Sequence, residues 1–134
     1  RASRKGVVTM PRRSIEIKSF VHVNPIPAAS RIGPLLVSSV IAPRDPGEQT
    51  VPDTPEGQYA NLFHHIGEIL AEAGADWRHV ARITFYVPDL SFRDSCNPIW
   101  IEHFPDADAR PARHTQMVAN SKVATCEFIA YIDD

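Results

Sequence analysis

The middle of the chain carries the pattern of one long amphipathic helix. Thr54 supplies a hydroxyl cap, Pro55 occupies the first turn, and Gly74 offers an end to the helix. Between these signals apolar residues recur at spacings of three and four, at Tyr59, Leu62, Phe63, Ile66, Ile69, Leu70 and Ala73. Such a face has to be buried against another layer of secondary structure.

Apolar runs on both sides of this helix predict five strands. Residues 14–23 alternate apolar and polar side chains, and residues 35–42 form a short apolar run that Pro43 ends. After the helix, residues 80–87 alternate again. Residues 113–119 and 123–132 predict two closing strands, joined by a turn at 120–122.

A second helix is expected at residues 91–104. Ile99, Trp100 and Phe104 form its apolar side, and Pro98 is expected to kink or restart it. The predicted order of elements is therefore ββαβαββ. An early hairpin, a late hairpin and two helices indicate an α+β fold, with a mixed sheet and both helices on one of its faces.

The opposite face of this sheet is expected to be neither a core nor a fully solvated surface. Alternation assigns to it a mixture of hydroxyl, charged and apolar side chains: Thr84, Tyr86, Arg113, Thr115, Met117, Thr125, Glu127, Ile129 and Tyr131. Faces of this kind are covered by other subunits, with polar groups lining a cavity between them.

Length and charge limit the class of protein. The 134 residues suffice for one domain, and we expect residues 1–14 to form a flexible basic tail before a single domain at 15–134. The formal net charge of −2 gives no electrostatic case for nucleic acid. No apolar run is long enough to cross a membrane, so we expect a soluble, cytoplasmic protein.

The sequence contains no motif for a metal ion or a cofactor. Its six histidines include no His-x-x-x-His pair, and neither a Cys-x-x-Cys pair nor a glycine-rich phosphate loop occurs. Cys126 shares one side of its strand with Phe128 and Ile132, which predicts a buried, inert thiol rather than a nucleophile.

Several segments follow one another in the order and spacing of a known family. They are residues 24–29, 32–39, 58–61, 73–75 and 80–89, together with Asn97 and Phe104. The most specific are Arg110-Pro111-Ala112-Arg113 and Glu127-Phe128-Ile129-Ala130. Over residues 24–132 the chain resembles the YjgF/Rid (reactive-intermediate deaminase) family, which is also labelled endoribonuclease L-PSP.

This resemblance implies a chorismate-mutase-like fold and a homotrimer with a central barrel, whose active clefts lie at the subunit interfaces. Family members typically hydrolyse enamines and imines of 2-keto acids, and no cofactor is expected for this chain. By resemblance, Arg113 binds the carboxylate of a small metabolite, which suits the fixed donor fork of a guanidinium. Glu127 resembles the acid that positions or activates a water. Ser39, Val40 and His114 complete the candidate substrate site.

Each candidate also has a structural interpretation. Arg113 can serve as an inter-subunit salt bridge, Glu127 can pair across an interface, and Ser39 can be an ordinary strand serine. Family deaminases usually show Gly-Gln where this chain has Val40-Ile41, and a small hydroxyl where it has His114. Three alternatives therefore stay open: a non-catalytic binding or regulatory trimer, an aminomuconate-type deaminase, and a ribonuclease or translation inhibitor. The acidic charge balance counts against the last of these.

Overall fold

The central helix begins and ends where its sequence signals lie. In the computed structural model, which describes residues 11–133, this helix is α1 (Pro55–Glu72). The Thr54 hydroxyl accepts a hydrogen bond from the Gly57 N–H at 3.1 Å. Gly74 follows the helix with a φ of +81°, a conformation that glycine adopts without steric cost. The predicted helix is therefore confirmed.

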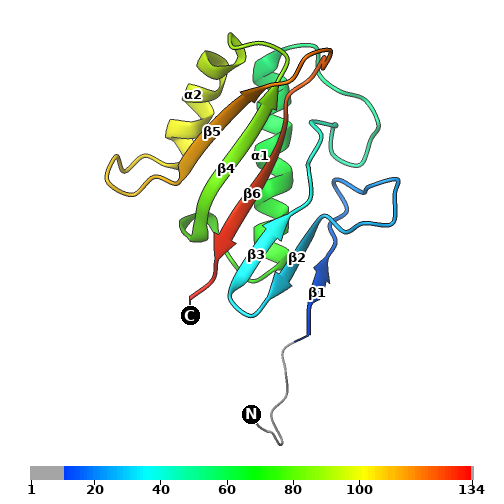
Figure 1. Ribbon diagram of the computed structural model, residues 1–134, viewed down its shortest axis with the longest axis vertical. Coiled ribbons are helices and arrows are strands. Elements are labelled where there is room, and N and C mark those ends of the chain that lie inside the picture. Colours follow the sequence, from blue (N-terminus) through cyan, green and yellow to red (C-terminus); the bar gives the residue numbers. More distant parts are fainter. Residues whose placement is uncertain (1–10, 134) are drawn as a thin grey trace, which may run out of the picture.

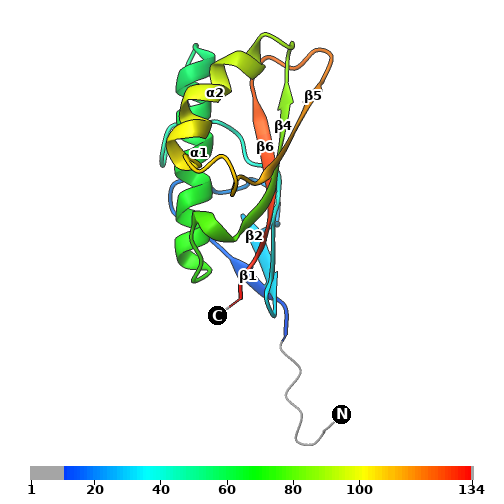
Figure 2. The ribbon, with the colours of Figure 1, turned by 90° about the vertical axis from the view of Figure 1, so that its left-hand side faces the viewer.

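Six strands form one sheet, and α1 packs against one face of it. They are β1 (Arg13–Ile15), β2 (Ala29–Ile32), β3 (Leu35–Ser38), β4 (Val80–Val87), β5 (Ala112–Met117) and β6 (Thr125–Tyr131). Their spatial order is β1-β2-β3-β6-β4-β5, as Figure 1 shows. The second helix, α2 (Phe92–His103), lies on the same side of the sheet as α1 (Figure 2). The predicted α+β class, with a mixed sheet and both helices on one face, is confirmed.

The first strands differ from the prediction. The strand expected at 14–23 covers only Arg13–Ile15, and β2, which was not predicted, forms a hairpin with β3. Three strands therefore precede α1 instead of two. The strand Ala29–Ile32 is short, contains a serine and an arginine, and lies between Pro27 and Pro34, so periodicity does not reveal it. Gly33, with a φ of +55°, permits the tight connection to β3.

The predicted late hairpin is wrong. β6 lies between β3 and β4 and pairs antiparallel with both, whereas β5 pairs parallel with β4 at the edge of the sheet. The cause is the connection through α2, because a helical crossover brings its two strands parallel. Pro98 also fails to restart the second helix, which runs unbroken from Phe92 to His103. Pro98 is exposed, while Cys96 and Trp100 bury the other side of α2.

Strand pairing decides which side chains share a face. Ile83 of β4 pairs with Arg113 of β5 and Phe128 of β6, and these three point toward the helices. Thr115 and Met117 continue that side. The predicted grouping of Arg113, Thr115 and Met117 with Glu127 is therefore wrong, since their pairing with β4 puts them in register with its helix-facing residues.

We call the other side of the sheet the open face. It carries the side chains that alternate with the core residues: Ile32, Leu35, Val37, Arg82, Thr84, Tyr86, His114, Gln116, Thr125, Glu127, Ile129 and Tyr131. No helix covers it in the described part of the chain, as Figure 2 shows.

Two further predictions concern the ends of the chain and the membrane. Of the predicted tail at residues 1–14, residues 1–10 lie outside the described part, and Arg13 and Ser14 belong to β1. Within residues 11–133, neither helix has the length and hydropathy needed to cross a membrane.

Candidate functional site

Arg113 projects from the edge strand β5 toward helix α2. Its Nη2 donates a hydrogen bond to the Asn97 Oδ1 at 2.9 Å. Its Cζ lies 5.1 Å from the centroid of the Trp100 ring, so the guanidinium is placed for a cation–π contact with the indole. Two neighbouring turns of α2 therefore hold the head group of Arg113.

Two ionisable side chains close to Arg113, Cys96 and Tyr59, are neutral. Burial raises the pKa of the Cys96 thiol to about 11, although the nearby Arg113 charge acts in the opposite direction. Burial also raises the pKa of Tyr59, whose hydroxyl donates to the Phe92 carbonyl oxygen at 2.8 Å. Both groups are therefore uncharged at neutral pH.

Within residues 11–133, no aspartate or glutamate forms an ion pair with Arg113. Its Nη1 is buried without a hydrogen-bond acceptor in the same part of the chain. A guanidinium without an acidic partner keeps both its charge and part of its donor capacity for an anion.

Glu127 lies on the open face, on β6. Its carboxylate accepts a hydrogen bond from the Tyr86 hydroxyl, and this bond raises the pKa of Tyr86. The pairing of Thr84 with Glu127 brings a second hydroxyl group to the same row of the sheet. Tyr86 was assigned to this face but not to the site. The sequence could have indicated this contact, because Tyr86 lies two residues after Thr84 and residues at this spacing share one face of a strand.

Arg113 and Glu127 point to opposite faces of the sheet. Arg113 aligns with Ile83 and Phe128, whereas Glu127 aligns with Thr84, one residue further along β4. A single chain therefore does not bring the guanidinium and the carboxylate into one cleft. A site that uses both needs a second chain.

Ser39 and Val40 follow strand β3. The Ser39 hydroxyl donates to the Pro27 carbonyl oxygen at 2.8 Å, and its N–H donates to the Ala28 carbonyl oxygen at 2.9 Å. The Val40 carbonyl oxygen accepts from the Nε2 of His22 at 2.7 Å, while the Val40 side chain is exposed. His22 was not among the predicted residues, and its sequence context held no signal for this bond.

His114 lies on the open face, where it pairs with Thr84 and is exposed. Through Thr84 it belongs to the same row of the sheet as Glu127. Of the five candidates, the structure therefore groups His114 with Glu127. Arg113 lies on the other side of the sheet. Ser39 and Val40, which follow β3, form hydrogen bonds with residues 22–28 and not with the other candidates.

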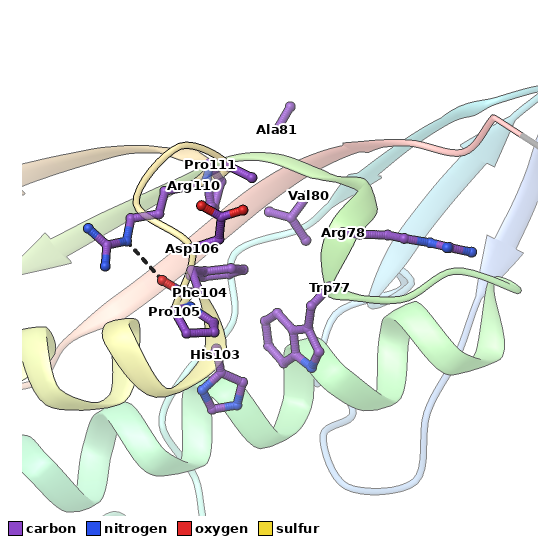
Figure 3. A pocket seen from close by; sticks show the side chains of 11 residues that line it. Trp77, Arg78, Val80, Ala81, His103, Phe104, Pro105, Asp106, Arg110 and Pro111 are labelled. Atoms are coloured by element: carbon purple, nitrogen blue, oxygen red, sulfur yellow. Dashed lines mark hydrogen bonds between the residues drawn. The ribbon is translucent and has the colours of Figure 1, made fainter.

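Two hollows of the surface lie elsewhere. One of about 440 Å³ is bordered by Trp77, Val80 and Phe104, and in Figure 3 the Arg110 guanidinium turns toward the Phe104 carbonyl oxygen, 2.8 Å away. Another, of about 450 Å³, lies between α1 and α2 and shares Trp77 and His103 with the first. Neither contains a predicted site residue. We assign the candidate site to Arg113 and Glu127, because a guanidinium can bind an anion and a carboxylate can accept a proton.

Metal-binding and thiol chemistry receive no support from residues 11–133. No group of three or more histidine, cysteine, aspartate or glutamate side chains is placed there to hold a metal ion. Cys126 is fully buried, and burial raises its pKa well above the ordinary value. The prediction that Cys126 is buried is confirmed.

Comparisons with known proteins agree with the family resemblance. Residues 16–128 match the family model described as Endoribonuclease L-PSP. A RutC family protein of Pyrococcus abyssi is 30% identical over 112 residues, which cover 81% of this chain and 87% of that protein. Reactive Intermediate Deaminase A of Arabidopsis thaliana, a chloroplastic protein, is 35% identical over 69 residues, which cover 52% of this chain.

The coverage of these relatives differs. The matched part of the chain spans 36% of the Arabidopsis protein and 46% of a RutC family protein of Aquifex aeolicus. The crystal structure of the YjgF gene product of E. coli superposes with a TM-score of 0.79 at 22% identity, covering 89% of this chain and 98% of that one. At this identity the structural likeness concerns the fold.

Proposed function

Because the chain belongs to the endoribonuclease L-PSP family, the YjgF/Rid group, we propose that it hydrolyses small enamine and imine metabolites of the 2-imino acid type. The observation that carries this proposal is the state of Arg113. Its guanidinium is fixed by Asn97 and Trp100, yet no acidic side chain of residues 11–133 neutralises it. Such a group is suited to the carboxylate of a 2-imino acid.

In the proposed reaction, water adds to the carbon of the C=N bond. The resulting carbinolamine loses ammonia as its C–N bond breaks, which leaves the 2-keto acid. Arg113 binds the carboxylate. Glu127 positions the attacking water, takes one of its protons and passes that proton to the nitrogen, which leaves as ammonia. Tyr86 donates to Glu127 and thereby orients the carboxylate that does this work.

This mechanism requires that the domain, residues 15–134, assembles with copies of itself. We propose a homotrimer in which the open face is covered, with Arg113 of one subunit facing Glu127 of the next. Support comes from the apolar side chains of that face, since Leu35 is 43% exposed and Tyr131 is 58% exposed. Sedimentation at micromolar concentration tests this assembly, and a species near the chain mass of 14.9 kDa would contradict it.

A coupled assay tests the reaction. A dehydratase generates 2-iminobutanoate or 2-aminoacrylate in place, and ammonia release is followed with and without this protein. We expect faster release in its presence and a smaller effect with the Glu127→Gln variant. The same rate with and without the protein would contradict the proposed activity.

The second candidate is a carboxylate-binding trimer without turnover. The region after β3 favours it, because Val40 stands where family deaminases usually have glycine and the Ser39 hydroxyl already donates to the Pro27 carbonyl oxygen. Calorimetry with 2-oxobutanoate separates the two candidates. Binding without ammonia release in the coupled assay would favour the non-catalytic protein.

A further inference from the structure

We propose that Trp100 is a positioning residue that holds the Arg113 guanidinium ready for an anionic ligand without neutralising it. This inference rests on the proposed carboxylate-binding role of Arg113. Arg113 Cζ lies 5.1 Å from the Trp100 ring centroid. A cation above an indole is attracted to the negative face of the ring, and the attraction is stronger when water is excluded.

The position of Trp100 is set by the core and not by Arg113. Its side chain is 8% exposed, and its ring packs edge-on against Phe104 with the centroids 4.8 Å apart. Phe104 in turn packs edge-on against Trp77 at 5.8 Å. The indole is therefore a rigid surface against which a mobile side chain can be held.

Arg113 needs such a surface because it lies on the edge strand β5. A long, flexible side chain loses rotamer freedom when it binds a ligand, and this loss weakens binding. The contacts with Trp100 and Asn97 restrict Arg113 before a ligand arrives. The side chain of Arg113 then loses its rotamer freedom when the chain folds and not when the ligand binds, so the affinity for the ligand is higher.

The groups that contact the Arg113 guanidinium carry no negative charge. An acidic partner would hold the guanidinium more firmly, but it would also compete with the carboxylate of the ligand. Asn97 contributes an amide, Trp100 an indole, and Cys96 a thiol that is protonated at neutral pH. All three restrict Arg113 and leave its positive charge uncompensated.

The chain offers a matched control, because it has only two tryptophans. Trp77 stacks on Phe63, with ring centroids 5.6 Å apart, and makes its contacts away from Arg113. The Trp77→Phe variant therefore leaves Trp100 as the only tryptophan. Its fluorescence then reports on the charge that lies above the indole.

The first experiment needs neither substrate nor turnover. Fluorescence spectra are compared for Trp77→Phe and for Trp77→Phe with Arg113→Gln. We expect the emission of Trp100 to differ in wavelength or intensity, because the substitution removes a cation from the face of the ring. Titration of Trp77→Phe with 2-oxobutanoate should also change the emission and saturate. Identical spectra for the two proteins would overturn the inference.

The second experiment measures the consequence for binding and turnover. We expect Trp100→Leu to weaken 2-oxobutanoate binding by about threefold to thirtyfold, the range that a cation–π contact supports. In the coupled assay the loss should raise KM more than it lowers kcat, because the carboxylate is bound before and during the reaction. Trp100→Phe keeps an aromatic face and should stay within about threefold of the wild type.

Folding has to be separated from positioning, since Trp100 is buried. Circular dichroism and sedimentation identify variants that keep the native fold, and if Trp100→Leu fails to fold, Trp100→Phe and the fluorescence comparison decide. Equal affinity in wild type and folded Trp100→Leu would overturn the inference, as would an equal loss in Trp77→Phe. Binding that depends on Trp100 without any ammonia release would support it and would reject only the deaminase reaction. A wild type that binds no 2-keto acid would overturn both.

Discussion

The two faces of the sheet differ in what completes them. On the side toward the helices, Phe85 and Phe128 are 0% and 2% exposed, so the chain buries this side by itself. On the open face, Leu35, Val37 and Tyr131 keep a third or more of their surface exposed. One chain therefore buries its own helix side, whereas the open face keeps apolar surface exposed, as faces that bind other proteins do.

The charged groups of the two faces share one property, although they lie on opposite sides of the sheet. Arg113 contacts neutral groups of α2 on the helix side, whereas the Glu127 carboxylate accepts the Tyr86 hydroxyl on the open face. Each is restrained within its own chain by a group that leaves its charge in place. In the proposed trimer, two groups that are restrained separately within each chain would form one site.

The largest effect should follow from a large-to-small change on the helix side. Phe128→Ala removes a buried ring from the core, and we expect the free energy of unfolding to fall by about 3–5 kcal/mol. Tyr131→Ala on the open face is the matched control, and it should change chain stability by much less because the ring is 58% exposed. Urea denaturation at several protein concentrations separates chain stability from assembly. Equal losses in the two variants would contradict the difference between the faces.

A change of one atom on the open face should affect catalysis and leave the fold. Glu127→Gln keeps the shape of the side chain and removes the proton acceptor, so turnover should fall about a hundredfold or more. Binding of 2-oxobutanoate should persist, because the proposed anchor of its carboxylate is Arg113 and not Glu127. Kinetics and calorimetry on one preparation test both halves. Unchanged turnover would leave Glu127 with a structural role.

On the helix side, the corresponding change is Arg113→Lys. Lysine keeps the charge but loses the planar fork, so a paired contact with a carboxylate becomes a single contact. Hydrogen bonds to charged groups contribute about 1.5–3 kcal/mol, and we expect affinity or catalytic efficiency to fall about tenfold to a hundredfold. The assembly should persist in sedimentation. Dissociation of the variant would indicate an inter-subunit salt bridge, and equal affinity would reject the carboxylate anchor.

The sequence predicted what depends on local pattern and missed what depends on strand pairing. Helix α1 was predicted within a residue of its start, because its cap, proline and apolar spacing act within a few residues of one another. The position of β5 at the edge of the sheet was missed. The local sequence of β5 does not show whether it pairs with β6 in a hairpin or with β4 after a helical crossover. The same error put Arg113 and Glu127 on one face. The family motifs name candidate residues, and their roles stay predictions, but the motifs carry no information on which face each side chain occupies.

The smallest expected effect is a pH dependence of stability that arises from His65, a buried histidine of α1. Its Nε2 donates to the Arg44 carbonyl oxygen at 2.8 Å, because a carbonyl can only accept. Its Nδ1 therefore accepts from the Ser19 hydroxyl, also at 2.8 Å, and the neutral ring is satisfied on both sides. Burial lowers the pKa of His65 below the value of 6.5 that an exposed histidine has.

This shift fixes the sign of a pH dependence. Between the lowered folded-state pKa of His65 and about 6.5, the unfolded chain binds more protons than the folded one. The contribution of His65 to stability should be constant above this window and decrease as the pH falls through it, by at most about 1.4 kcal/mol per pH unit. Urea denaturation of wild type and His65→Gln across this range measures the slope. His114→Gln, which changes an exposed histidine of the open face, serves as the comparison for the effect of a histidine-to-glutamine substitution elsewhere. A slope that is unchanged in His65→Gln would show that other groups cause it.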